Sequence, residues 1–331
     1  MAHFAPPKLV LLGTGGGPLP SPFRTGISQA IVVGEGVYLV DCGSDVTRQL
    51  RRARLLKNLR QVYLTHLHSD HDCDYFNLFL LGWPILQWNP PIDVYGPGPA
   101  GGRAALPDDG DIPLVAEEQP TPGVRALTDL HVRAHAYDLN IRMREAGRSD
   151  LRTMIVPHEI ELPPDLGAAG PEHVAPPMKP TLVAEDADVR VTAVLVQHAP
   201  VFPAFAFRFE TEKGSIVVSG DTAPCANLLT LAQGADVLVH EVFDDQTYEQ
   251  WPDEPAGGTD ASDKQEHHLV TSHTPLSQVG KVATEAGVGR LVLTHFVPGD
   301  DTKPDDHWIK GAEADYEGEI IVGKDLLELP L

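Results

Sequence analysis

The sequence predicts an α/β protein, because strand-like runs and helical patterns accompany each other in both halves of its 331 residues. Apolar runs rich in Val, Ile and Leu are bounded by glycine, which is typical of strands. Polar side chains recur directly after these runs, and α/β folds place their sites at strand ends. We expect a single domain over residues 1–331, with an irregular insertion at about 100–190.

The first hundred residues contain most of one expected sheet. An apolar run begins at Lys8, and two more within 28–40 predict a hairpin through Gly34 to Gly36. Leucines recur at helical spacing within Arg48–Arg60, so this segment predicts an amphipathic helix whose arginines face solvent. Two further strands are expected, one directly before His66 and one in the run "IDVYG".

The pattern changes between about 100 and 190, where proline, glycine and acidic residues are frequent. Periodicity is clear only in "HVRAHAYDLNIRMREAG" and "MIVPHEIELPPD". Long segments of this kind often form lids or substrate walls, and a loose connector is the alternative. Regular structure returns with four strand-like runs over 189–243, a helical pattern over 275–288 and a last strand over 290–296.

Composition excludes several classes of protein. The hydrophobic content of 42% is ordinary for a globular chain, and no apolar run approaches the roughly 20 residues that a membrane span needs. No signal-type segment begins the chain, so we expect a cytoplasmic protein. The 3 cysteines lack CxxC spacing and predict neither a disulfide framework nor a thiolate zinc site. A net charge of −22 argues against a nucleic-acid partner.

Histidine and aspartate side chains form the most distinctive pattern, and it centres on "THLHSDH". Imidazole and carboxylate groups suit zinc, iron or manganese, and a site without thiolate accepts any of them. One tetrahedral ion cannot use all of the candidate ligands, whereas two ions with a shared carboxylate can. The candidates are His66, His68, Asp70, His71, His198, Asp221 and His295.

"THLHSDH" fits the HxHxDH signature of the metallo-β-lactamase fold superfamily, and the later order of His198, "SGDT" and "THF" also resembles that superfamily. The resemblance implies a four-layer αββα sandwich with two divalent metal ions at one edge. Of the possible ions it favours Zn²⁺, with Mn²⁺ or Fe²⁺ as alternatives. It also implies that a metal-bridging hydroxide is the attacking group. The ligands it implies are His66, His68 and His198 for one ion, Asp70, His71 and His295 for the other, and Asp221 between them.

Other residues match supporting positions of the superfamily. Asp41 in "VDCG" resembles the aspartate that orients a metal-bound histidine. "SGDTAP", "HEVF", "SHTPLSQVG" and "LVLTHF" are similar to the branch that contains ribonuclease Z and arylsulfatases. That similarity implies catalytic roles for Asp70 and for His240, Glu241 and His273, the last three in proton transfer. The "GTGGGP" stretch is expected to form a tight turn near the site.

The sequence differs from ribonuclease Z at several positions, and these differences favour a small ester-type substrate. A sulfate ester or a phosphodiester is the favoured substrate class. Ala223 replaces an arginine of that family, and the Arg-Tyr pair expected after His295 is absent. The short stretch between His198 and Asp221 leaves no room for a tRNA-gripping arm. The alternatives are a ribonuclease Z-like endonuclease acting at the 3′ end of tRNA and a lactone or thioester hydrolase.

A redox diiron protein is a further alternative, but such relatives usually carry glutamate where this chain has His68. Dimers are common in this branch, and this analogy favours a homodimer. We considered four aromatic residues as a wall for a planar substrate group, with ordinary core packing as the alternative: Trp83, Trp88, Phe202 and Phe205. The remaining histidines are expected at the surface: His131, His135, His158, His173, His267, His268 and His307.

Overall fold

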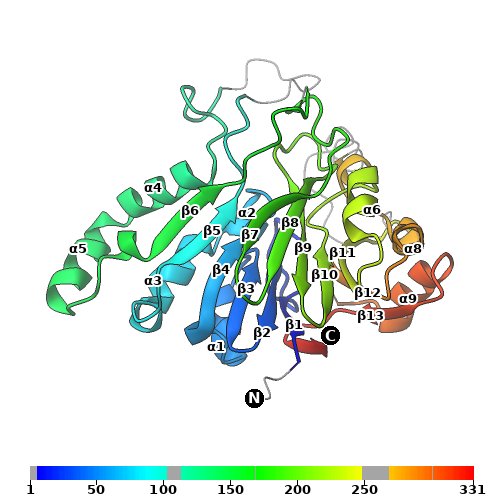
Figure 1. Ribbon diagram of the computed structural model, residues 1–331, viewed down its shortest axis with the longest axis horizontal. Helices are drawn as coiled ribbons and strands as arrows, with labels where there is room; N and C mark the ends of the chain where they lie inside the picture. Colours follow the sequence, from blue (N-terminus) through cyan, green and yellow to red (C-terminus); the bar gives the residue numbers. More distant parts are fainter. Residues whose placement is uncertain (1–5, 103–112, 168, 248–267, 300) are drawn as a thin grey trace.

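The computed structural model describes the chain except for residues 1–5, 103–112, 168, 248–267 and 300. Two seven-stranded sheets pack face to face, and helices cover their outer faces (Figure 1). Helices α1 and α3 lie on the side of the amino-terminal sheet, and α6, α8 and α9 lie on the other side. The expected α/β class and four-layer αββα sandwich are therefore confirmed.

The amino-terminal sheet joins both ends of the described chain. Its order is β14 (Leu327–Pro330), β1 (Lys8–Gly13), β2 (Ser28–Val33), β3 (Gly36–Val40), β4 (Leu59–Tyr63), β5 (Ile92–Gly96) and β6 (Ile155–Glu159). Strands β2 and β3 form the predicted antiparallel hairpin. From β3 to β6 the strands are parallel, so the carboxyl ends of β3 and β4 meet at one edge of the sheet.

The second sheet directs its strand ends to a common edge as well. Its order is β13 (Glu319–Val322), β12 (Arg290–Val297), β11 (Val237–Phe243), β10 (Gly214–Val218), β9 (Phe205–Thr211), β8 (Arg190–Leu195) and β7 (Thr181–Glu185). Strands β10 to β13 are parallel, and β9 is antiparallel to both β8 and β10. The carboxyl ends of β8, β10, β11 and β12 therefore share one edge.

Several helices pack apolar faces against the sheets. The helices are α1 (Val46–Arg52), α2 (Ser69–Asp72), α3 (Tyr75–Leu86), α4 (Val124–Ala134), α5 (Ala136–Glu145), α6 (Ala226–Ala232), α8 (Leu276–Ala286) and α9 (Asp305–Glu313), with short 3₁₀ turns at Leu56–Asn58 and Leu151–Thr153. In α8, Val279, Val282 and Ala283 recur at helical spacing and are buried. Within the described residues, no helix is both long and apolar enough to cross a membrane.

Strand β1 shows why the sequences of the expected strands are continuous apolar runs. Leu9 and Leu11 belong to the core between the two sheets, whereas Val10 and Leu12 belong to the core beneath α1 and α3. All four side chains are fully buried. A strand covered on both faces needs apolar residues at every position, so the alternation typical of half-exposed strands is lost.

The helix expected over Arg48–Arg60 is shorter than predicted. Helix α1 ends at Arg52, and Arg54 adopts a left-handed backbone conformation with φ 61°. Leu59 already belongs to β4. The leucines of this segment are buried as expected, but a helix, a turn and a strand contribute them in succession. Leucine spacing alone did not reveal the change of structure.

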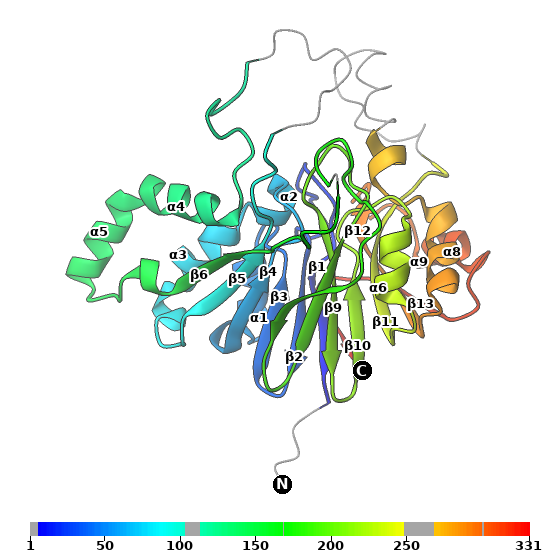
Figure 2. The same ribbon diagram turned by 45° about the horizontal axis from the view of Figure 1, so that its top comes forward.

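The segment at about 100–190 contains more regular structure than expected. It supplies α4 and α5 and the edge strands β6 and β7 of the two sheets. Figure 2 shows α4 and α5 beside β6. Both edge strands are largely half-buried or exposed, so they lack the continuous apolar runs that identified the central strands.

Candidate metal centre

The turn after β4 presents four of the candidate ligands. His66 follows the strand, and His68 has an extended backbone at φ −73° and ψ 147° directly before helix α2. The His71 backbone N–H donates to the His68 carbonyl at 3.0 Å, which closes the helical turn. The chain therefore changes direction between the HxH pair and the Asp70–His71 pair, and each pair enters a different group of ligands.

The first group consists of His66, His68 and His198. One ring nitrogen from each lies within 4.8 Å of the others. The Nδ1 atom of His68 is 3.2 Å from Nε2 of His198. Burial holds the pKa values of His66 and His198 well below their ordinary value, so both rings are neutral and can donate a lone pair to a cation.

The second group consists of Asp70, His71, Asp221 and His295. The Nε2 atoms of His71 and His295 are 3.3 Å apart, and Nε2 of His295 is 3.3 Å from Oδ2 of Asp70. Burial alone would raise the pKa of Asp221, but His295 and His71 outweigh it and hold that pKa well below the ordinary value. Asp221 therefore remains ionised among the imidazoles.

Asp221 faces both groups with different oxygens. Its Oδ1 lies 3.3 Å from Nε2 of His71 and 3.4 Å from Nε2 of His295. Its Oδ2 lies 3.9 Å from Nε2 of His66 and 4.0 Å from Nε2 of His198. A carboxylate in this position can join two cation sites, and the bridging role implied for Asp221 stays a prediction.

Supporting hydrogen bonds orient two of the rings. Nδ1–H of His71 donates to Asp41 at 2.8 Å, and the Thr65 backbone N–H holds the same carboxylate at 2.8 Å. Nδ1–H of His198 donates to the Ser272 carbonyl at 2.9 Å. These bonds place the proton on Nδ1 and direct the Nε2 lone pair to the centre. The position of Asp41 matches the orienting role implied for it.

The donor set fits a pair of divalent cations. Nε2 of His66 and Oδ1 of Asp221 are buried and have no hydrogen-bond partner among the described residues. Such atoms are costly in a protein interior unless a ligand satisfies them. The nitrogen and oxygen donors match the preferences of Zn²⁺, Mn²⁺ and Fe²⁺. The buried clusters are consistent with a dinuclear metal site.

A third group places Glu241 and His273 beside Asp221 and His295. Nδ1–H of His273 donates to Glu241 Oε2 at 2.9 Å, and the Thr222 backbone N–H donates to Oε1 at 2.6 Å. Burial lowers the pKa of His273, but Glu241 outweighs this effect and the pKa rises to about 9. An imidazole with a raised pKa therefore lies next to the second group, and the catalytic role of His273 stays a prediction.

His240 lies outside the three groups found among the described residues. It precedes Glu241 in β11, and successive side chains of a strand point to opposite faces. Nδ1–H of His240 donates to the Glu241 carbonyl at 2.7 Å, and burial lowers its pKa to about 4. No ligand group of the described residues includes the His240 side chain, and its catalytic role stays a prediction.

A cavity of about 500 Å³ opens onto the clustered ligands. Its lining includes Gly17, and a Cβ atom at that position would collide with Asp70. The Gly15 backbone N–H donates to Thr25 and that of Gly16 donates to Phe296. The glycine stretch therefore pairs with two distant segments beside the site, and its lack of side chains allows the close approach. The expected tight turn stays a prediction.

The aromatic wall weighed against core packing for the mouth of the site does not form. Trp83 and Phe205 are buried core residues, exposed by 1% and 0%, whereas Trp88 is 81% exposed after α3. Only Phe202 lines a cavity, a separate one of about 330 Å³. Core packing was therefore the better interpretation for Trp83 and Phe205.

One of the histidines expected at the surface lies in the site. His268 lines the same cavity as His273, although no sequence motif indicated this. Its position one helical turn before Ser272 was the available signal, because Ser272 precedes His273. His267 falls outside the described residues. His158 and His307 instead pair with Asp93 and Asp244, at 2.7 and 3.0 Å.

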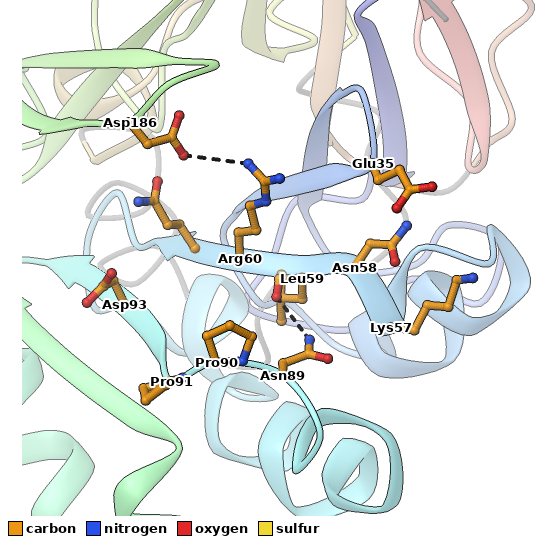
Figure 3. Close-up of a pocket in the computed structure, with 11 residues that line it drawn as sticks. Glu35, Lys57, Asn58, Leu59, Arg60, Asn89, Pro90, Pro91, Asp93 and Asp186 are labelled. Atoms are coloured by element: carbon orange, nitrogen blue, oxygen red, sulfur yellow. Dashed lines mark hydrogen bonds and ion pairs between the residues drawn. The ribbon is translucent and has the colours of Figure 1, made fainter. Parts of the chain in front are cut away.

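A second cavity, of about 370 Å³, lies at the opposite end of the amino-terminal sheet (Figure 3). It surrounds the start of β4 and β5, and its charged lining residues include Lys57, Arg60 and Asp186. Figure 3 shows Arg60 directed toward Asp186. A guanidinium nitrogen of Arg60 lies 3.9 Å from Oδ2 of Asp186. No histidine or cysteine lines this cavity, so it lacks the donors of the metal centre.

Comparisons with known proteins agree with this geometry. The family model described as "Metallo-beta-lactamase superfamily" matches residues 24–312. Proteins named Ribonuclease Z are similar over nearly the whole chain. That of Mycobacterium bovis (strain BCG / Pasteur 1173P2) is 31% identical over 96% of both chains, and that of Mycolicibacterium gilvum (strain PYR-GCK) is 30% identical over 96% of this chain and 94% of its own.

Two solved structures are similar in fold. The metallo-beta-lactamase fold protein YhfI from Bacillus subtilis aligns with a TM-score of 0.62 and 18% identity, covering 98% of this chain and 99% of its own. The short form of human tRNase Z aligns with a TM-score of 0.60 and 22% identity, covering 97% of this chain and 98% of its own. The αββα fold, the clustered ligands and these similarities lead to one conclusion: the chain belongs to the metallo-beta-lactamase superfamily and is a metal-dependent hydrolase of that fold.

Proposed function

We propose that the chain is a phosphodiesterase of the ribonuclease Z type. The observation that carries this proposal is the Glu241–His273 pair, which clusters with Asp221 and His295 and whose histidine lines the same cavity. Hydrolysis of a phosphodiester produces a leaving alkoxide that needs a proton. The similarity to proteins named Ribonuclease Z over 96% of the chain supports the same choice.

The proposed ligands are the seven side chains predicted from the sequence, with Asp221 between the two sites. We propose zinc as the resident ion, because the donors are imidazole and carboxylate groups that zinc accepts in catalytic sites. When bound, two such cations activate a water molecule and offset the charge of the phosphoryl oxygens. Asp70 faces the cavity and would help to hold and orient the attacking water.

His273 would transfer the proton in this proposal. Glu241 accepts from its Nδ1–H, which leaves the Nε2 edge of the ring toward the cavity. The carboxylate stabilises the imidazolium before the transfer and fixes the orientation of the ring. Asp41 and Ser272 act through His71 and His198, whose rings they orient.

The proposed substrate class narrows from a sulfate ester or a phosphodiester to a phosphodiester. A sulfate ester has no support from the relatives described above, whereas a phosphodiester has. RNA is therefore a substrate to test in spite of the net charge of −22. Between His198 and Asp221 the chain forms only a loop and the β9–β10 hairpin, so an RNA substrate would have to bind without an arm inserted there.

Purified protein loaded with Zn²⁺ or Mn²⁺ tests the proposal against three substrates: bis(p-nitrophenyl) phosphate, p-nitrophenyl sulfate and a precursor tRNA with a 3′ trailer. We expect turnover of a phosphodiester. Release of the trailer would identify an RNA-processing enzyme, and turnover of the small diester alone would identify a small-molecule phosphodiesterase. Turnover of the sulfate with both phosphodiesters intact would contradict the proposal.

A further inference from the structure

Arg24 is a buried arginine in the segment between β1 and β2, and its side chain is 7% exposed. Burying a guanidinium is costly unless hydrogen bonds and an opposite charge compensate it. The proton transfer and metal binding proposed above give this cation no role. Its contacts lie around the end of β12, and they indicate what the buried charge does there.

The guanidinium joins three separate segments to the end of β12. Its Nη1 donates to the Thr14 hydroxyl at 2.9 Å and to the Gly323 carbonyl at 3.0 Å. Its Nη2 donates to Asp301 at 2.8 Å. The guanidinium carbon lies 4.1 Å from the centroid of the Phe296 ring, in a cation–π contact. These contacts surround the residue that directly follows His295.

The backbone of Phe296 is held by the same part of the chain. Its N–H donates to the Thr14 carbonyl at 3.0 Å, and its carbonyl accepts from the Gly16 N–H at 3.1 Å. A Cβ atom at Gly16 would lie only 3.0 Å from Nδ1 of His295, so this backbone packs closely against the ring. Arg24 contacts the side chains of both Thr14 and Phe296 and therefore fastens the turn that touches His295.

His295 differs from two other proposed ligands in how its ring is oriented. Nδ1–H of His71 donates to Asp41, and Nδ1–H of His198 donates to the Ser272 carbonyl. Nδ1 of His295 is buried and has no hydrogen-bond partner among the described residues. The backbone of His295 also has φ 46°, a left-handed conformation that persists only where the surroundings enforce it. Packing around the chain must therefore direct its Nε2 to the second ligand group.

We propose that Arg24 is a positioning residue of the metal centre. It holds Phe296 and the turn around it, so that His295 stays directed to the group formed with Asp70, His71 and Asp221. The contact with Phe296 takes the place of a hydrogen bond to Nδ1 of His295. The inference deepens the proposed function and rests on the ligands proposed there.

A purely structural role gives a different prediction, because it would lower stability without selecting one cation site. Arg208 on β9 is a matched control. Its side chain is 18% exposed, and its Nη1 donates to the carbonyls of Leu231 and Gln233, both at 3.0 Å. It does not line the metal cavity. Arg208→Met therefore removes a largely buried guanidinium of the same kind from another part of the fold.

The experiment titrates metal-free protein with Co²⁺, followed by its visible spectrum, and with Zn²⁺, followed by calorimetry. Arg24→Met and Arg24→Lys are compared with the wild type and with Arg208→Met, and thermal unfolding of the metal-free forms measures stability. His295→Ala identifies which binding step belongs to the second ligand group, because that step should be lost in this variant.

We expect Arg24→Met to weaken that step on the order of tenfold while the other step stays unchanged. Arg24→Lys should weaken it by a smaller factor, because the ammonium keeps a cation near Phe296. Arg208→Met should leave both steps unchanged even where it lowers stability. If Arg24→Met does not fold, Arg24→Lys decides by the same criterion.

Equal weakening of both steps, an equal change in Arg208→Met, or an unchanged titration of the Arg24 variants would overturn the proposal. These outcomes leave the proposed ligands intact, provided that the wild type binds two ions. Fewer than two bound ions in the wild type would overturn the proposed ligands and this inference together.

Discussion

The two ends of the sandwich contain cavities of similar size but very different chemistry. At the carboxyl ends of the strands, buried histidines and carboxylates converge around a cavity of about 500 Å³. At the amino ends of β4 and β5, a cavity of about 370 Å³ is lined by Lys57, Arg60 and Asp186. The ion pairs of Arg60 are partly exposed, whereas Asp221 is buried. The two ends differ because buried histidines and carboxylates converge only at the carboxyl ends of the strands, among the residues described here; the size of the cavities does not separate them.

Substitution of Asp221 should reduce metal binding and activity more than any other change considered below. Asp221→Ala removes the carboxylate that faces both ligand groups, so we expect loss of bound metal and a fall in kcat of on the order of 1,000-fold or more. Metal analysis and steady-state kinetics measure both effects, and circular dichroism checks the fold. Asp186→Ala is the control at the other end. Undiminished turnover by Asp221→Ala would contradict the assignment.

Substitution of His273 should separate proton transfer from metal binding. His273→Ala removes the proposed donor but none of the seven ligands, so kcat should fall by roughly 100-fold or more while metal content stays constant. A substrate whose leaving group needs no proton should be much less affected. Equal losses for good and poor leaving groups would argue that His273 only supports the structure.

Substitution of Asp41 should have an intermediate effect. Asp41→Ala removes the acceptor that orients His71, and supporting residues of this kind typically contribute about 10- to 100-fold to metal affinity. Titration of the metal-free variant with Zn²⁺ in a competing chelator measures the change. The idea that Asp41 acts through His71 fails if metal affinity is unchanged.

Substitution of Arg60 should have the smallest effect. Arg60 pairs with Asp188 at 2.7 Å and with Asp186 at 3.9 Å, and all three side chains are partly exposed. Ion pairs of this kind contribute at most about 1 kcal/mol to the free energy of unfolding. Arg60→Ala should therefore leave kcat and metal content unchanged in the assays above. A large loss of activity would show that the amino-terminal end participates in function.

Sequence patterns predicted much of the metal edge because its residues occupy strand ends. The HxHxDH spacing identified a compact turn, and Asp221 and His295 follow apolar runs that could only be central strands. Their convergence depends on parallel neighbours in each sheet, a property of topology that the resemblance to the superfamily supplied. The fold class and the clustering of these residues could therefore be predicted from the sequence.

Other features required the fold itself. His240 and Glu241 are adjacent in the motif, yet the period of a strand places their side chains on opposite faces. His268 lies in a segment without a recognisable motif, and the path of the chain brings it to His198, which is distant in sequence. The segment over 100–190 was underestimated because edge strands are only partly buried.

The central claim is that the seven side chains hold two divalent cations per chain. Elemental analysis of the protein as purified, combined with calorimetric titration of the chelated protein with Zn²⁺, tests it most directly. We expect two bound ions per polypeptide in the wild type and fewer in Asp221→Ala. Less than one bound ion per polypeptide, under conditions where the protein is folded and active, would contradict it.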